Sequence, residues 1–274
     1  MEYGDPKRNE TYAPTVSLAV IRTLLAIAAQ RKWVVEQSDV VTAFLNTKLC
    51  ENGLEKLYLE PPPGYNIEAN KVLLLKKAIY GLKQAGRLWN ENITNTMRKL
   101  EFTQLKCEPC VFKKPDIYVC IYVDDLFIIS RDTKTCHEFL NALSKHHDIK
   151  RLGKADWILG IKITHATDYS YTIDQKLYIT KVLERFNMQQ CKEVSTPAIP
   201  IKKNIDSELD EKFNYRDAIG CLLFIARDTR PDIMFAVARA SRKVSNPTRD
   251  DVQHVKRIFR YLCHTKNYRL KING

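Results

Sequence analysis

The chain has 274 residues, 45% of them hydrophobic, so it can bury a sizeable core in one large or two smaller domains. Its formal net charge of +12 favours a polyanionic partner such as a nucleic acid. The first residues lack the apolar core of a secretory signal, and no stretch approaches the roughly 20 apolar residues of a membrane helix. We therefore expect no membrane partner, and the eight scattered cysteines indicate reduced thiols inside a cell.

The first third of the chain predicts one core-facing helix followed by short strands. Apolar residues recur at helical spacing from a possible N-cap at Ser17 up to Gln30. The segment 34–40 predicts a strand that carries Asp39 near its end, and a turn or short helix follows at 43–45. Two brief strands are expected at 56–60 and 72–75, the first ended by a proline-rich segment.

The middle of the chain predicts a long helix and then a strand hairpin. Apolar residues line one side of the helix over 82–100, and basic residues line the other. The segments 111–112 and 117–129 are β-prone, and the pair Asp124–Asp125 interrupts the second. This pair is expected to lie at the tip of a tight hairpin.

The last part begins with a helix capped at Asp132 and a second hairpin formed by 157–164 and 171–173. A helix is expected from Gln175, then a polar linker over 192–212, and only helices beyond it. One of these starts at a capping box formed by Thr248 and Asp251. From residue 216 to 271 there are thirteen Lys or Arg against five Asp, so this region is cationic.

The acidic pair at the hairpin tip has two readings. Aspartate is common in turns, so Asp124 and Asp125 can serve the turn alone. Phosphoryl transfer, however, uses carboxylates that hold two Mg²⁺ ions about 3.5–4 Å apart. Asp39, 85 positions before Asp124, supplies a third carboxylate if the two strands are neighbours in one sheet. Magnesium keeps most of its waters or phosphates, so two or three carboxylates suffice.

Several segments, in order, resemble the reverse transcriptases of copia-type long-terminal-repeat retrotransposons. The match covers nearly the whole chain, from about Glu10 to Tyr268, and the ordered set is far more specific than Tyr-Val-Asp-Asp alone. The first acid motif and the polymerase signature are similar to 37–46 and 122–125, and the template- and nucleotide-positioning motif to 75–89. The remaining similar segments are 57–65, 152–153 with 159–161, and the basic helices of 215–266.

The resemblance implies roles for individual residues. The magnesium carboxylates would be Asp39, Asp124 and Asp125, holding two ions. Phe44, five residues after the first acid, would screen the sugar 2′ position, although it can also be an ordinary core residue. The residues implied to bind the nucleotide are Val40, Phe44, Lys83 and Gln84; those implied near the primer terminus are Trp157 and Gly160; those implied to contact the nucleic-acid backbone are Arg242, Lys256, Arg257 and Arg260.

The resemblance also implies an α+β fold. A polymerase palm, an antiparallel sheet with packed helices, would occupy 37–174, between partial fingers with a lead-in helix at 1–36 and a basic, helical thumb or connection region at 175–274. The expected activity is RNA-directed DNA synthesis by two-Mg²⁺ nucleotidyl transfer onto a primer 3′-hydroxyl. The expected partners are an RNA template, a DNA primer or duplex, and deoxynucleoside triphosphates, and the expected location is the cytoplasm, in a virus-like particle, or the nucleus.

The sequence also departs from the family pattern. Many relatives have Pro where this chain has Gly86 and Lys where it has Val41. We expect the basic fingers segment that precedes Glu10 in relatives, and the ribonuclease H, integrase and protease regions, to be missing. An inactive, truncated transposon remnant and a basic nucleic-acid-binding module therefore stay open as alternatives. A two-metal nuclease fits less well, since no activating His or Glu cluster accompanies the acids.

Overall fold

The computed structural model describes residues 11–49, 56–65, 68, 71–200 and 213–274. The chain divides into two compact units, Met1–Ala155 and Asp156–Gly274, which are described separately. The expected linker lies partly outside the described residues, since it includes 201–212. No helix in the described part of the chain is long and apolar enough to cross a membrane.

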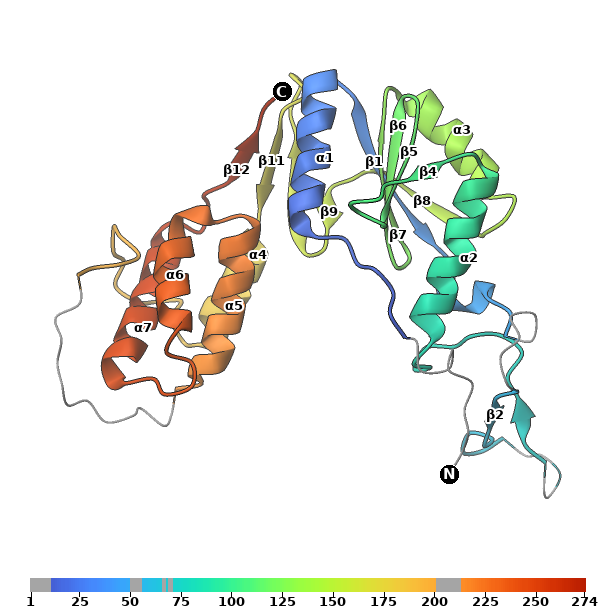
Figure 1. The fold of residues 1–274 in the computed structure, drawn as a ribbon. Coiled ribbons are helices and arrows are strands. Elements are labelled where there is room, and N and C mark those ends of the chain that lie inside the picture. The colour runs from blue at the N-terminus through green and yellow to red at the C-terminus, as the bar shows by residue number, and fades with distance from the viewer. Residues whose placement is uncertain (1–10, 50–55, 66–67, 69–70, 201–212) are drawn as a thin grey trace. The chain divides into compact units, whose positions relative to one another are not determined.

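The first unit is built on a six-stranded antiparallel sheet with the strand order β4-β5-β6-β7-β1-β8 (Figure 1). Its strands are β1 (Val34–Val40), β4 (Thr103–Gln104), β5 (Val111–Lys114), β6 (Ile117–Tyr122), β7 (Asp125–Ser130) and β8 (Ile149–Lys154). A separate two-stranded sheet pairs β2 (Tyr58–Leu59) with β3 (Leu73–Leu74). The mixed α and β composition with antiparallel sheets agrees with the expected fold class.

Helices cover both faces of the six-stranded sheet. Helix α1 (Leu18–Arg31) contacts β1 and β7 on one face, while α2 (Ala85–Lys99) and α3 (Thr133–Leu143) lie on the other (Figure 1). Side chains alternate between the faces along each strand, so residues of β1 and β7 contribute to both layers. The core on the side of α2 and α3 includes Trp89 and Phe139. This packing fixes the central strands β1 and β7, which carry the expected acids.

The hairpin predicted around the acidic pair is confirmed, with its tip one residue earlier than expected. Tyr122 pairs with Asp125, so the two-residue loop consists of Val123 and Asp124. Asp125 is the first residue of β7. The helices expected after Ser17 and Asp132 are also present, although only Asp132 caps its helix through its side chain.

Two strands of this sheet were not predicted. Strand β8 pairs with β1 along most of its length, and the short strand β4 pairs with β5. Most of the β8 side chains are exposed, and its sequence is rich in Lys and Arg around Gly153. An exposed edge strand shows no apolar alternation, so its sequence carries little signal for a strand.

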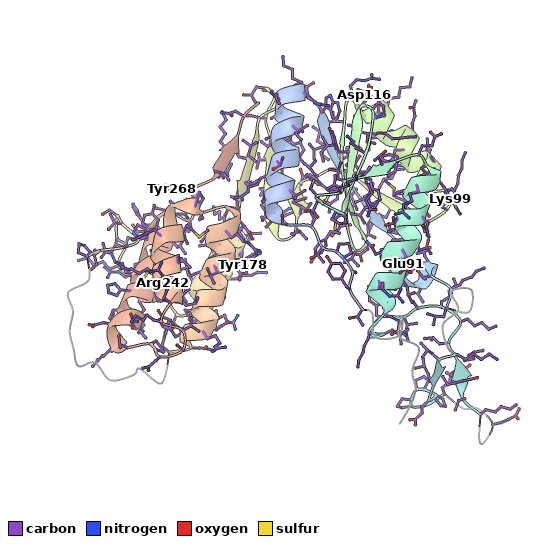
Figure 2. The ribbon with its side chains drawn as sticks, viewed as in Figure 1. Glu91, Lys99, Asp116, Tyr178, Arg242 and Tyr268 are labelled. Carbon is purple, nitrogen blue, oxygen red and sulfur yellow. The ribbon has the colours of Figure 1, made fainter. Side chains whose placement is uncertain are left out.

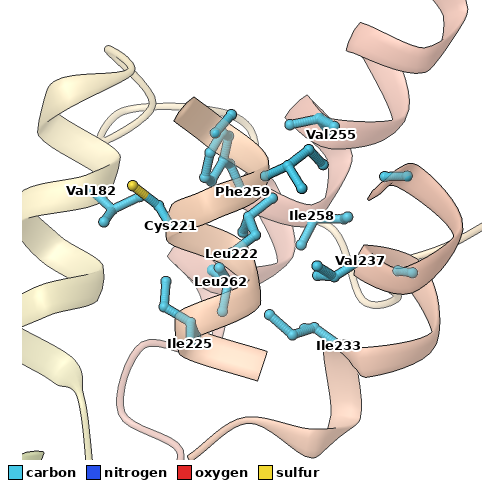
Figure 3. Packing of buried hydrophobic residues seen from close by; sticks show 14 of the residues in the cluster. Val182, Cys221, Leu222, Ile225, Ile233, Val237, Val255, Ile258, Phe259 and Leu262 are labelled. Carbon is cyan, nitrogen blue, oxygen red and sulfur yellow. The ribbon is translucent and has the colours of Figure 1, made fainter. Parts of the chain in front are cut away.

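The second unit combines a four-stranded sheet with a group of helices. The sheet has the order β12-β11-β10-β9. Its strands are β9 (Trp157–Ile158), β10 (Ile161–His165), β11 (Tyr171–Asp174) and β12 (Leu270–Ile272). The helices are α4 (Lys176–Arg185), α5 (Tyr215–Asp228), α6 (Met234–Ser241) and α7 (Arg249–His264), with a 3₁₀ turn at Pro231–Ile233. Their apolar faces enclose one core, which includes Leu222, Val237 and Phe259 (Figure 3).

The structure corrects two expectations in this unit. The region after the linker is not only helical, because β12 returns to pair with β11. The expected single strand over 157–164 is two strands, since Ile158 pairs with Ile161 across a two-residue turn. Leu159 and Gly160 both have positive φ, 49° and 80°, as type I′ hairpin turns require. The capping box of Thr248 and Asp251 is confirmed.

A buried arginine joins the turn after α5 to the end of α7. Arg230 is 1% exposed and donates to both carboxylate oxygens of Asp232, at 2.9 and 2.7 Å. Its guanidinium also donates to the backbone carbonyl and the hydroxyl of Thr265. Tyr261 donates a further hydrogen bond to Asp232 at 2.9 Å. Each charge buried here therefore has an opposite charge or a hydrogen-bond partner.

Candidate active site

The three expected acids come together at one end of the central strands. Asp39 of β1 lies directly opposite Asp125 of β7 in the antiparallel register. Opposite residues in such a pair point to the same face of the sheet. Asp124 lies in the loop immediately before Asp125, and its carbonyl accepts a hydrogen bond from the amide of Val40 at 2.8 Å. The adjacency that the sequence left open is therefore present in the fold.

The electrostatics of this group show carboxylates that repel one another. Burial raises the pKa of Asp39, and the carboxylates of Asp124 and Asp125 raise it further. Burial also raises the pKa of Asp125, with a contribution from Asp124, while a hydrogen bond from Gln37 Nε2 to Asp125 Oδ1 at 3.1 Å opposes the rise. Like charges gathered in a partly buried place are unfavourable unless a cation binds. The arrangement is thus prepared for a positive ligand.

One lysine beside the acids was missed in the sequence. Lys150 on β8 pairs with Asp39, and its charge lowers the pKa of that carboxyl in part. Lys150 is exposed. Sequence reasoning could not find it because β8 itself was not predicted, and an exposed lysine in a polar segment is unremarkable by composition.

The backbone around the acids contains two strained residues. Val123, in the loop, has φ 56°, and Thr42, just after β1, has φ 49°. Among the eight non-glycine residues with positive φ in the described part of the chain, these two alone are β-branched. A β-branched residue in this region is an outlier, and such strain concentrates at functional sites.

Three of the residues expected to bind the nucleotide, Phe44, Lys83 and Gln84, lie in the 3₁₀ turn after β1 and at the start of α2. Phe44, in the 3₁₀ turn Ala43–Asn46, is half-buried, and its ring centroid lies 4.5 Å from that of the exposed Tyr80. Phe44 also packs against a small cluster that includes Ala85, so the start of α2 lies beside it. Gln84 is the N-cap of α2 and is 6% exposed, while Lys83 is exposed.

Val40, which the resemblance implies would bind the nucleotide, has its backbone amide engaged elsewhere. Its amide donates to the carbonyl of Asp124, and its side chain is 1% exposed in the core. The amide of Val41 likewise donates to the carbonyl of Asp148. Both amides are therefore engaged within the protein, and the role expected of Val40 is corrected to holding the end of β1 against the hairpin loop.

The expected primer-side residues belong to the second unit. Trp157 is 41% exposed in β9, and Gly160 completes the type I′ turn with its φ of 80°. Gly160 is suited to this position because the left-handed region carries no penalty for glycine. Trp157 and Gly160 therefore lie in one hairpin, and that hairpin belongs to a different unit from the acids.

Of the four expected backbone-contacting cations, three already have partners within the second unit. Arg257 donates to the hydroxyl of Thr196 at 2.8 Å, and Arg260 donates to the carbonyl of Lys192 at 2.6 Å. The ammonium of Lys256 lies 5.3 Å from the centroid of the Phe213 ring. All three side chains are half-buried. Arg242, which follows α6, is exposed (Figure 2).

The acids supply only part of a metal site. No group of three or more His, Cys, Asp and Glu side chains in the described ranges is arranged to hold a metal ion. The donor set of Asp39, Asp124 and Asp125 is nevertheless all carboxylate oxygen, the ligand type that Mg²⁺ prefers. Magnesium usually takes one or two carboxylates and fills its remaining positions with water and substrate phosphate. The residues thus fit an open site that is completed by substrate.

Comparison with known proteins decides the family. Residues 3–200 match the family described as reverse transcriptase (RNA-dependent DNA polymerase). The chain belongs to this family. The resemblance to copia-type elements is confirmed as well, because the relatives are proteins of Ty/copia-type transposons. The family in general uses divalent metal ions.

Three relatives illustrate the match. The chain is 38% identical over 274 residues to the retrovirus-related Pol polyprotein from transposon TNT 1-94 of Nicotiana tabacum, covering 94% of this chain and 20% of the relative. It is 34% identical over 268 residues to that from transposon RE1 of Arabidopsis thaliana, covering 94% and 18%. It is 33% identical over 242 residues to the putative transposon Ty5-1 protein YCL074W of Saccharomyces cerevisiae, covering 85% and 77%. The chain thus spans about a fifth of the length of the two plant polyproteins.

Proposed function

We propose that this chain is the core of an RNA-directed DNA polymerase that adds deoxynucleotides to the 3′-hydroxyl of a primer. The observation that carries the proposal is the meeting of Asp39 and Asp125 across two central strands, with Asp124 in the adjoining loop. Family membership supplies the reaction class. The raised pKa of Asp39 and of Asp125 supports it, because it marks a site that gains from binding cations.

In this proposal Asp39, Asp124 and Asp125 hold two Mg²⁺ ions together with the triphosphate of the incoming nucleotide. The ions, when bound, would lower the pKa of the attacking hydroxyl and stabilise the leaving pyrophosphate. The protein contributes orientation. The hydrogen bond from Val40 to the carbonyl of Asp124 ties the loop to the end of β1, so the acids keep their places before substrate arrives.

Phe44 is proposed to select the sugar. Its half-buried ring is braced by Tyr80 and by the start of α2, so it cannot move aside easily to admit a 2′-hydroxyl. Gln84 and Lys83 are proposed to contact the incoming nucleotide or the template from the beginning of the same helix. Phe44 is therefore the residue whose replacement by a smaller side chain should admit ribonucleotides.

The second unit is proposed to hold the template–primer duplex. Trp157 and Gly160 would lie near the primer terminus, and Arg242, Lys256, Arg257 and Arg260 would contact phosphates from the cationic helices. Such contacts are independent of sequence and weaken steeply between about 50 and 200 mM salt. The proposed palm over 37–174 runs past the boundary of the compact units at Ala155 and into β9–β11, with the thumb or connection helices after it.

A primer-extension assay tests the proposal. With poly(rA)·oligo(dT), dTTP and Mg²⁺, Asp124→Asn should lower extension about a thousandfold or to background, the scale on which loss of one essential catalytic group acts. Duplex binding should stay within a few fold of the wild type, since only one side chain oxygen is changed. The matched control is Asp116→Asn, because Asp116 lies in the tight turn between β5 and β6 of the same sheet.

Three outcomes separate the readings. Loss of extension in Asp124→Asn with retained activity in Asp116→Asn supports the polymerase. Equal extension by both variants and the wild type contradicts the carboxylate assignment. Tight duplex binding without extension by any of them instead favours an inactive, basic nucleic-acid-binding fold.

A further inference from the structure

The loop that carries Asp124 adopts a conformation its sequence does not favour. Val123 is β-branched and has φ 56°, in the region where Gly, Asn and Asp are usual. Its side chain is half-buried and packs against the core cluster between the sheet and helices α2 and α3. A free loop of this sequence would relax away from this geometry, so other parts of the fold must hold it.

Trp89 of α2 makes the contact that holds it. The indole Nε1 donates a hydrogen bond of 2.6 Å to the carbonyl oxygen of Val123. The Trp89 side chain is among the largest fully buried in the protein, at 2% exposure, and it comes from a helix 34 positions earlier in the chain. A buried indole N–H needs an acceptor, so this bond both satisfies Trp89 and fixes one carbonyl of the loop.

The second loop carbonyl is fixed from the other side. The carbonyl of Asp124 accepts the hydrogen bond from the amide of Val40 at 2.8 Å. Both carbonyl groups of the loop thus accept hydrogen bonds, one from a side chain of α2 and the other from the backbone of β1. Once the two carbonyls are fixed, the carboxylate of Asp124 projects from a set position beside Asp39, whose pKa it raises.

Trp89 is itself braced by a buried histidine. The ring of His147 meets the Trp89 ring edge-on, with centroids 5.2 Å apart and an interplanar angle of 84°. His147 Nε2 lies 3.0 Å from the hydroxyl of Thr96, one more α2 residue, and the His147 ring is 6% exposed. Burial and the nearby His146 lower the pKa of His147, so the ring is neutral at neutral pH. Thr96 thus holds His147, and His147 packs edge-on against Trp89, which contacts the loop.

We infer that Trp89 is a positioning residue, which clamps Val123 in its strained conformation and so sets the carboxylate of Asp124 for metal binding. This inference rests on the proposed polymerase function. Trp89 lies in the core and acts through the Val123 carbonyl, so its loss should change the use of the acids more than the affinity for nucleotide or duplex.

The test replaces the donor and keeps an aromatic ring. Trp89→Phe removes the indole N–H, and Trp33→Phe is the matched control. Trp33 is also buried, at 6% exposure, and it contacts Arg31 and Tyr118 rather than the loop. Trp89→Phe should lower kcat about tenfold, the size of effect of one lost buried hydrogen bond, with the KM for dTTP and the duplex Kd within twofold. Trp33→Phe should leave all three unchanged within twofold.

Two further readouts do not depend on catalysis. Mn²⁺ binding without nucleic acid, followed by electron paramagnetic resonance, should weaken several-fold in Trp89→Phe and remain unchanged in Trp33→Phe. Amide NMR should show exchange broadening at Val123 and Asp124 in Trp89→Phe alone. If the wild type neither extends a primer nor binds Mn²⁺, the proposed function fails, and the NMR comparison still decides whether Trp89 holds the loop.

A double-mutant cycle separates positioning from general packing. Glycine adopts positive φ without strain, so in the Val123→Gly background the loop needs its restraint less. Trp89→Phe should then lower kcat about threefold instead of tenfold, a non-additive result expected of coupled residues. Equal tenfold losses in both backgrounds, or loop dynamics that match those of Trp33→Phe, would overturn the inference.

Discussion

The two units each contain partly buried carboxylates whose pKa values are shifted in opposite directions. In the first unit, Asp39 and Asp125 lie opposite each other with Asp124 beside them, and the pKa of Asp39 and of Asp125 is raised. In the second unit, burial alone would raise the pKa of Asp232, but the hydrogen bonds and charge of Arg230, with the Tyr261 hydroxyl, more than offset it and lower the pKa. In the first arrangement the charge of Lys150 only partly offsets the effects that raise the pKa of Asp39, whereas in the second Arg230 and Tyr261 more than offset the effect of burial.

This difference separates a site from a structural joint. A carboxylate that is already paired with a buried guanidinium adds stability only through that pair and has little to offer a ligand. A set of mutually repelling carboxylates is less stable by itself and gains from an added cation. The comparison therefore predicts that neutralising Arg230 or Asp232 lowers the stability of the second unit, whereas neutralising Asp39 raises the stability of the metal-free first unit.

The largest effect is expected from Arg230→Met. The substitution leaves the carboxylate of Asp232 without its partner and removes the hydrogen bonds to Thr265. Arg230 is buried but Asp232 is partly exposed, so the loss of several charged hydrogen bonds should cost about 2–3 kcal/mol, and unfolding of the second unit in urea, followed by circular dichroism, should shift to a lower midpoint. Arg242→Met, at an exposed position of the same unit, should change the free energy of unfolding by less than about 0.5 kcal/mol. Similar midpoints for the two variants would remove Arg230 from this role.

A smaller loss is expected from Asp232→Asn, and it should depend on pH. Hydrogen bonds to a charged group contribute about 1.5–3 kcal/mol, and the partial exposure of Asp232 reduces this to about 1–2 kcal/mol at pH 7. Because the pKa of Asp232 is lowered in the folded protein, its contribution is complete above the pKa of the unfolded chain. It is lost as the pH falls through the folded value. Unfolding measured from pH 7 to pH 3 should therefore show the variant and the wild type converging, and a constant difference would contradict the ion pair.

The smallest effect, of opposite sign, is expected from Asp39→Asn in the presence of EDTA. The raised pKa of Asp39 means that its contribution to stability is present below the unfolded pKa and is lost as the pH rises through the folded value. Removing the charge should stabilise the metal-free protein by about 0.5 kcal/mol at pH 7, a small value because the group is partly exposed. The gain should vanish near pH 3. Asp116→Asn serves as the contrast, since the carboxylate of Asp116 is paired with Arg131 and its removal should bring no gain. Destabilisation by Asp39→Asn would show that the carboxylates do not repel.

Local patterns in the sequence were enough to predict the elements that carry the site. The apolar arms around Asp124 predicted the hairpin, and helical spacing after Ser17 predicted α1. Thr248 with Asp251 predicted the start of α7 through a capping box. These signals are short-range, since a cap or a two-residue turn depends on residues within a few positions of each other.

Strands that depend on distant partners escaped prediction. Strand β12 is three residues long and exists because it pairs with β11, about a hundred positions earlier. Strand β8 is an exposed edge strand whose pairing with β1 brings Lys150 opposite Asp39. Neither segment has the apolar alternation that marks a strand, so pairing energy rather than local propensity determines both.

By itself, the sequence was enough to propose the candidate residues: Asp39, Asp124 and Asp125 from residue type and position, and Phe44 through the family resemblance. Only the tertiary structure decided how they are held. The strained backbone of Val123, the indole of Trp89 behind it and the amide of Val40 act across separations of 34 and 84 positions. No local pattern encodes such contacts, because each arises only when the helix, the strand and the loop pack together.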